Sequence, residues 1–338
     1  MKKKIIIGVP HHFDFSKLIQ KNLEFLGFEV INISYDRNDF QYASITDKII
    51  NFGRKSLIGD RNYKESLIFN KFGQESFNKI ANIQEKVDYA FLIRPDLFPK
   101  KFIYLIKSKT HNLIGYQWDG FDRYPEIRNY LSLFDKFFVF EKKDINIKNG
   151  LIGITNFYFD FDEFNYNNQI INDVYFVGSH VKCRINDVNK LSIFFSDKQI
   201  VTDLRILSNE NQSFYHHNIR LIKNYLTYQE NILALQQSKC SIDLINYIHK
   251  GLSFRTFEAL KYRKKLITNN SIIKNYDIYK HQNIFDLTSR NWEELETFIS
   301  SPYEPISDNL YEKYSFTNWI KNILDIQPYI EITLPNDK

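Results

Sequence analysis

Short apolar runs and amphipathic stretches alternate along the first part of the chain. Residues 4–10 (KIIIGVP) are too few for a helix and end in turn residues, which predicts a strand buried on both faces. Residues 16–26 carry apolar side chains at helical spacing and stop at Gly27, and a second apolar run follows at 29–35. The order strand, helix, strand predicts the β-α-β unit that opens a parallel sheet.

This alternation continues through both halves of the chain. Further strands are predicted at residues 89–93, 113–117, 136–140, 151–155, 173–179, 199–202, 240–244 and 265–268. Helices are predicted at residues 100–108, 124–133, 218–234 and 255–260. The polar segment 36–87 is longer than a usual crossover and is predicted to be helical, either as an insertion that faces an acceptor or as helical padding.

A polar stretch at residues 160–172 separates two successive α/β halves. A chain of 338 residues exceeds what one hydrophobic core usually organises. We therefore expect an α/β fold with two domains, residues 1–165 and 166–338. The last helix is a candidate to pack back on the first domain.

The composition is that of a folded protein, with 43% hydrophobic and 25% charged residues, and the net charge of +5 is spread along the chain. The basic clusters at 1–4 and 261–265 are short, and we interpret them as solvated ends of structural elements, so no nucleic-acid partner is expected. Cys183 and Cys240 lack the spacing of a disulfide framework or a zinc site, which indicates a reducing compartment.

No stretch reaches the roughly 18 apolar residues of a membrane span, and the apolar run after the N-terminal lysines is too short for a signal peptide. We therefore expect a cytoplasmic protein. A peripheral contact with the inner face of the membrane is left open, as is the oligomeric state.

The most informative segment is residues 251–270, GLSFRTFEALKYRKKLITNN. A short helix that begins after Ser253 offers backbone N–H groups and a positive dipole end to a diphosphate. Arg255, in the first turn of this helix, can chelate phosphate oxygens. Ser253 and Thr256 are further candidates to bind the donor. Glu258 lies one turn further on, where its carboxylate can accept hydrogen bonds from the two hydroxyls of a ribose.

This segment resembles the group-1-like family of GT-B glycosyltransferases, which carry an R-x-F-E-A motif followed by a short strand, and the similarity is clear over residues 238–270. The resemblance implies two Rossmann-like domains that face a cleft, with the nucleotide sugar in the second domain and Glu258 on its ribose. It also implies that no cofactor and no bound metal are needed. Related retaining enzymes have a further glutamate where this chain has Lys250, so retention or inversion of the anomeric configuration stays open. In the alternative interpretation the helix only packs its apolar side chains, and Arg255 and Glu258 are solvated.

A second phosphate-binding candidate follows the strand at residues 173–179. Gly178 and Ser179 form a small-residue turn whose backbone N–H groups can meet the donor phosphates, with Lys182 and Arg184 close by. Small residues after a first strand are common in α/β folds, so the two cations could equally be ordinary surface charges.

Three loops after strands of the first half are candidates for the catalytic base. Asp119 and Asp122 lie among aromatic residues that could stack on sugar rings, Trp118, Phe121 and Tyr124, and a carboxylate there could deprotonate an acceptor hydroxyl. The alternative is a turn at Asp119 and a helix N-cap at Asp122.

His11 follows the first strand and could also act as the base, with a structural or solvent-exposed role as the alternative. The loop at residues 94–96 faces the same edge and ranks below the other two.

The expected function is transfer of a sugar from a nucleotide-activated donor to a glycan or lipid-linked acceptor, in bacterial lipopolysaccharide, capsule or related surface-glycan biosynthesis. The assignment to surface glycans follows from the family resemblance alone. The alternatives are a non-catalytic bilobed protein that binds a small ligand, and a transferase that uses another activated donor such as a CMP-linked acid sugar.

Overall fold

The computed structural model describes residues 2–10, 14–37, 39–59, 62–162, 169–245 and 250–335. The chain forms two compact units, Met1–Ile154 with Ile323–Asp325, and Thr155–Asn322 with Ile326–Lys338. The predicted domain boundary at residue 165 falls among residues 163–168, which lie outside the described part of the chain. Each unit is described by itself.

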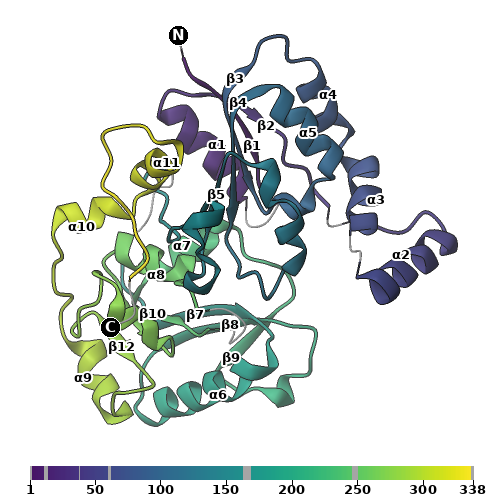
Figure 1. Ribbon diagram of the computed structural model, residues 1–338. Coiled ribbons are helices and arrows are strands. Elements are labelled where there is room, and N and C mark those ends of the chain that lie inside the picture. Colours follow the sequence, from purple (N-terminus) through teal and green to yellow (C-terminus); the bar gives the residue numbers. More distant parts are fainter. Residues whose placement is uncertain are drawn as a thin grey trace. The chain divides into compact units, whose positions relative to one another are not determined.

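The first unit is built on a six-stranded sheet in which every pair of neighbours is parallel (Figure 1). Its strands are β1 (Lys4–Gly8), β2 (Glu29–Asn32), β3 (Val87–Ile93), β4 (Thr110–Gln117), β5 (Lys136–Val139) and β6 (Leu151–Gly153). Their order across the sheet is β2-β1-β3-β4-β5-β6. The continuous apolar runs of β1 and β3 are buried on both faces, as the sequence predicts.

The helices of this unit are α1 (Phe15–Phe25), α2 (Ile45–Ile58), α3 (Asn62–Phe72), α4 (Gln74–Ala81) and α5 (Lys100–Ser108). The helical prediction for residues 36–87 is confirmed by α2, α3 and α4.

The predicted helix at residues 124–133 is wrong in type, since the segment forms two 3₁₀ turns, η2 (Pro125–Asn129) and η3 (Leu131–Leu133). Side chains three residues apart eclipse in a 3₁₀ turn, and this spacing buries Ile127, Tyr130 and Leu133 in the core together.

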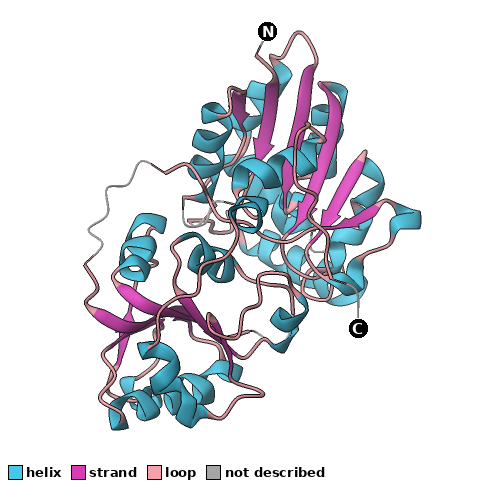
Figure 2. Cartoon of the chain, turned by 90° about the vertical axis from the view of Figure 1, so that its left-hand side faces the viewer, coloured by secondary structure: helices cyan, strands magenta, loops and turns pink. Residues whose placement is uncertain are grey.

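The second unit has its own six-stranded parallel sheet (Figure 2). The strands are β7 (Asn172–Ser179), β8 (Thr202–Leu207), β9 (Ile219–Ile222), β10 (Ser238–Asp243), β11 (Lys265–Thr268) and β12 (Ile284–Asp286). Read from β9, the order β9-β8-β7-β10-β11-β12 is the 3-2-1-4-5-6 order of a Rossmann fold. The predicted class, α/β with two Rossmann-like domains, is confirmed.

The helices of the second unit are α6 (Lys182–Asp197), α7 (Tyr228–Gln236), α8 (Phe254–Lys261), α9 (Leu295–Ser300), α10 (Asp308–Lys313) and the first part of α11 (Phe316–Leu324). None of the helices described is long and apolar enough to cross a membrane.

Two predictions fail in this unit. The strand expected at 199–202 begins only at Thr202, because Gln199 takes a left-handed conformation (φ 55°) that ends the turn after α6. The helix expected at 218–234 divides into β9 and α7. A capping box between Thr227 and Glu230 starts α7 there, where the side chain of each residue bonds to the backbone of the other.

Each sheet has its own hydrophobic core. In the first unit the core includes Ile103 and Phe102 of α5 packed with Leu92 and Leu113 of the sheet. In the second unit β7 and β8 pack against Leu191 and Phe195 of α6 and against α9. The two cores are apolar, so the polar side chains at the carboxyl ends of the strands are the candidates for a functional site.

Candidate functional site

The strand order of the second sheet reverses between β7 and β10. Open α/β sheets bind ligands outside the carboxyl ends of their strands at such a point, because the connections leave it in opposite directions. Here β7 ends at Ser179 and β10 ends at Asp243, and α8 follows the loop after β10. The predicted donor-binding residues therefore gather where the fold favours a ligand.

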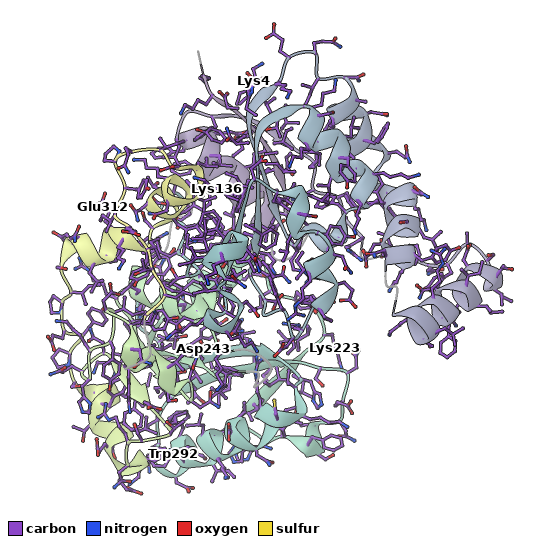
Figure 3. All side chains as sticks on the ribbon, viewed as in Figure 1. Lys4, Lys136, Lys223, Asp243, Trp292 and Glu312 are labelled. Atoms are coloured by element: carbon purple, nitrogen blue, oxygen red, sulfur yellow. The ribbon has the colours of Figure 1, made fainter. Side chains whose placement is uncertain are left out.

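Asp243, labelled in Figure 3, organises the first turn of α8. Its carboxylate is 3% exposed and accepts hydrogen bonds from Ser253 Oγ at 2.7 Å and from Thr256 Oγ1 at 3.4 Å. Arg255 Nη1 lies 3.7 Å from its other oxygen. Ser253 is also the N-cap of α8 and accepts from Arg255 N at 3.2 Å. The two hydroxyls predicted to bind the donor are thus bonded within the protein.

Arg255 connects α8 to the end of β7. Its Nη2 donates to the carbonyl oxygen of Val177 at 2.7 Å, and its guanidinium lies 6.0 Å from the centre of the Phe176 ring. A guanidinium carries five N–H donors in a fixed plane, more than these contacts and the Asp243 ion pair use. The side chain is 28% exposed, so a phosphate can reach it.

Gly178 brings a second guanidinium to the same strand end. A Cβ added at Gly178 would lie 2.9 Å from Cζ of Phe176, closer than real Cβ atoms come, so the ring needs glycine there. The same point lies 3.6 Å from Nη1 of Arg184, which follows in the first turn of α6. Two arginines from two different helices therefore meet the carboxyl end of β7.

Ser179 and Lys182 are exposed beside this pair of arginines. Ser179 is the last residue of β7, and Lys182 is the first residue of α6. Between them, His180 hydrogen-bonds through Nδ1 to the hydroxyl of Tyr215.

Glu258 is buried, with 5% of its surface exposed. Asn231 Nδ2 donates to its Oε2 at 3.3 Å, and the hydroxyl of Tyr175 donates to Oδ1 of Asn231 at 3.0 Å. Burial raises the pKa of Glu258 from 4.5 to about 7, while the nearby Arg255 and the bond from Asn231 oppose the rise. The interpretation that Glu258 is merely solvated is wrong. A buried carboxylate that titrates near neutrality is common in functional sites.

Sequence reasoning missed three members of this group. Asp243 carried a signal, since it is an acidic residue inside the apolar strand 240–244. Tyr175 and Asn231 carried none, because their relation to Glu258 is formed by β7 and α7 packing beside α8 and not by spacing along the chain.

The asparagines that end the motif bond to the described residues on either side of positions 246–249, in the segment between β10 and α8. Asn270 Nδ2 donates to the carbonyl oxygen of Lys250 at 2.8 Å, and Oδ1 of Asn269 accepts from Ile245 N at 2.9 Å. The end of the LITNN segment therefore shapes the approach to α8.

The basic run at residues 261–265 differs from its predicted role as a solvated end. Lys261 forms an ion pair with Asp162, Lys264 donates to the carbonyl oxygen of Gln236 at 2.6 Å, and Lys265 is 3% exposed and donates to Ser301 Oγ at 2.6 Å. These three ammonium groups are each paired with an acceptor of the second unit, so they are not solvated ends.

In the first unit, Asp119 is held by two arginines. Arg123 Nη1 lies 2.7 Å from its Oδ1 and Arg94 Nη1 lies 3.7 Å from its Oδ2. Arg94 is itself buried, bonds Asp96 through two nitrogens at 2.9 and 2.6 Å, and stacks 3.4 Å from the centre of the Tyr124 ring. The loop at 94–96, which ranked last from sequence, is thus part of the same cluster as Asp119.

The other candidates of this unit are placed differently. Asp122 is a surface carboxylate paired with Lys143 at 2.7 Å, and this pair lowers its pKa. Phe121 is 3% exposed and belongs to the core, so it is not available to stack on a sugar. Trp118 packs edge-on against Phe15, with ring centres 6.1 Å apart. His11 lies outside the described residues.

Among the residues described, no group of three or more His, Cys, Asp or Glu side chains could hold a metal ion. The strand orders and the residues at the ends of β7 and β10 define a double-Rossmann α/β protein with a polar site at the switch point of its second sheet.

No family model matches the chain, and no curated relative is found. Among solved structures the chain is similar to a UDP-glucosyltransferase from Polygonum tinctorium capable of glucosylating indoxyl, in complex with 3,4-dichloroaniline. That likeness has 9% identity and a TM-score of 0.41, and it covers 79% of this chain and 80% of the other. A second similar structure is an alpha1,3-fucosyltransferase, with 12% identity, a TM-score of 0.41, and coverage of 97% and 94%. Similarity at this level does not support an argument about function. The function is therefore inferred from the site.

Asp243→Ala should lower the free energy of unfolding of the second unit by about 2 kcal/mol, because it leaves the hydroxyls of Ser253 and Thr256 without their acceptor. Asp243→Asn keeps one carbonyl acceptor and should cost less. Urea unfolding followed by tryptophan fluorescence measures both. Equal stability of wild type and the alanine variant would contradict this role.

Glu258→Gln tests the raised pKa. Between pH 4.5 and about 7 the native state keeps a proton that the unfolded chain has lost, so the wild type loses stability as the pH rises, on the order of 3 kcal/mol in all. Glutamine has no proton to lose. The difference in free energy of unfolding between the variant and the wild type, measured by denaturant titration, should therefore grow across this range. If the two free energies change in parallel with pH, the pKa of Glu258 is not raised.

Asp119→Asn should destabilise the first unit by about 1–2 kcal/mol, since it leaves two neighbouring arginines without a shared carboxylate. Asp122→Asn removes an exposed partner of Lys143 and serves as the matched control, with an unchanged midpoint of urea unfolding. Equal effects of the two substitutions would remove the structural distinction between them.

Proposed function

We propose that this protein is a glycosyltransferase that moves a sugar from a nucleotide-activated donor to a glycan or glycolipid acceptor. The observation that supports this most is the grouping of Arg255, Arg184 and buried Glu258 around the ends of β7 and β10. The resemblance of residues 238–270 to the group-1-like GT-B family supports it from the sequence.

The two arginines would bind the diphosphate of the donor. Guanidinium groups form paired hydrogen bonds with phosphate oxygens, and they approach the end of β7 from α6 and α8. Charge develops on the leaving diphosphate during transfer, so fixed cations there lower the barrier without proton movement. We propose that these arginines, with Lys182 at the start of α6, supply this charge in place of a metal ion.

Glu258 would bind the ribose. An ionised carboxylate accepts from two vicinal hydroxyls at once, and the chain Tyr175–Asn231 already fixes one of its oxygens. The pKa of Glu258 is about 7 in the protein without a nucleotide. Hydrogen bonds from the diol would favour the ionised form of its carboxylate.

The acceptor would bind to the first unit, at the loops that follow β3 and β4. Asp119 is the proposed base, and its two arginines would also orient an acceptor hydroxyl near it. The setting in bacterial lipopolysaccharide, capsule or related surface-glycan biosynthesis, in the cytoplasm at the inner face of the membrane, is part of this proposal.

Isothermal titration with UDP, GDP, ADP, TDP and CMP tests the donor site. At least one nucleotide should bind, and Glu258→Gln should weaken it by about tenfold or more, because the variant loses a charged hydrogen-bond acceptor. The affinity of the wild type should rise by about tenfold between pH 6 and pH 8 as Glu258 ionises. Absence of binding to every nucleotide would overturn the transferase proposal.

The 2′-deoxy form of the best nucleotide supplies the matched control. If Glu258 holds the ribose, the loss of the 2′-hydroxyl should weaken binding to the wild type and leave binding to Glu258→Gln nearly unchanged, since the two changes remove the same contact. Additive losses would assign Glu258 a structural role and leave the nucleotide site without it.

A further inference from the structure

Helix α2 (Ile45–Ile58) turns its apolar side chains to solvent. Five large hydrophobic residues on this one helix are exposed, Ile45 by 79%, Ile49 by 64%, Ile50 by 40%, Phe52 by 71% and Leu57 by 85%. Ile45, Ile49 and Phe52 are spaced by four and three residues and therefore form one stripe along the helix.

The opposite face of α2, turned to the protein, is polar. Oδ1 of Asp47 accepts from the hydroxyl of Tyr63 at 2.8 Å, and Nδ2 of Asn51 donates to the hydroxyl of Tyr42 at 2.9 Å. Arg54 lies 5.0 Å from the centre of the Tyr63 ring. A helix on the surface of a globular domain normally buries its apolar stripe and exposes its polar face. Helix α2 has the opposite orientation.

The helix is well formed although no core covers it. Ser44 caps its first turn by accepting from Asp47 N, and Gly59 ends it in a left-handed conformation (φ 66°). In Figure 1, α2 lies beyond α3 and away from the strands of the first sheet. The exposed stripe therefore belongs to a capped, regular element.

The charges beside the stripe indicate what kind of partner it would fit. Lys48 and Lys55, seven residues apart, follow one edge of it, and both are exposed. Neither lysine has an ion pair with a residue that the structure describes. The only acidic residue of the helix, Asp47, is on the inner face. An apolar stripe bordered by lysines is the pattern of a helix that lies in the interface of an anionic bilayer.

A second copy of the chain fits less well. A helix of this length is about 21 Å long and about 10 Å wide, a footprint on the order of 200 Å², whereas a stable interface covers about 800 Å² per partner. Two antiparallel α2 helices would also bring lysines of the two copies together.

We propose that α2 is a membrane-docking helix that inserts Ile45, Ile49 and Phe52 among the lipids of an anionic bilayer surface, with Lys48 and Lys55 on the headgroups. This inference deepens the proposed setting at the inner face of the membrane, but its observations do not depend on the proposed glycosyl transfer. It would hold the first unit at a lipid surface without any membrane-spanning segment.

Co-sedimentation of the full chain with vesicles tests the proposal. The protein should bind vesicles of equimolar phosphatidylcholine and phosphatidylglycerol, bind pure phosphatidylcholine much less, and lose binding as salt is raised. The double variant Ile49→Ser, Phe52→Ser should lower the partition coefficient by about 100-fold or more. The variant Lys48→Glu, Lys55→Glu should lower it by about 20-fold or more.

Matched controls come from other exposed positions. Ile147→Ser with Phe214→Ser removes the same two residue types at sites 82% and 54% exposed. Lys101→Glu with Lys148→Glu makes the same change of net charge. Both control pairs should bind as the wild type does, and all variants should keep the wild-type melting temperature.

Three results would overturn the proposal. The wild type could fail to bind the anionic vesicles, or the control pairs could lose as much binding as the α2 variants. The third is a concentration-dependent dimer, seen without lipid and abolished by Ile49→Ser with Phe52→Ser while vesicle binding persists, which would assign the stripe to a second copy.

Discussion

The carboxylate of Asp243 is the constraint on which the site of the second unit depends. It lies at the end of β10 and bonds the N-cap hydroxyl of α8, a second hydroxyl in the same turn, and the guanidinium of Arg255. Because Arg255 also bonds the carbonyl of Val177, one buried charge fixes the position of α8 relative to both β7 and β10. The strand order creates the switch point, and this carboxylate determines which side chains occupy it.

Glu258 depends on this arrangement indirectly. Its helix is set by Asp243, and its carboxylate is then met by Asn231 from α7 and through it by Tyr175 of β7. The neighbouring Asp243 adds to the effect of burial on Glu258, and Arg255 opposes both. The protonation of Glu258 therefore reflects the geometry of three elements, and small displacements of α8 would change it.

The fold could be predicted from the sequence where apolar runs are continuous. The runs at β1, β3 and β7 are largely buried on both faces, and their pattern alone indicates a parallel sheet. The boundary between β9 and α7 could not be predicted, since β9 has only four residues, is interrupted by Arg220, and is defined by its pairing with β8 and not by a local pattern. Arg255 and Glu258 could be found because they lie in one motif. Arg123 lies four residues after Asp119 and could be found from that spacing. The approach of Arg94 to Asp119 and the burial of Phe121 arise from packing and leave no pattern in the sequence.

The capping box of α7 has a consequence for how the protein can vary. Thr227 and Glu230 lie on the surface and fix where α7 begins, and Asn231 is the residue that follows. The partner of Glu258 therefore takes its orientation from a pair of side chains that need not touch a ligand. Substitutions at this surface cap would shift Asn231 and thereby change the pKa of the buried Glu258. Relatives of this chain could then differ in ligand preference while every residue around Glu258 stays the same.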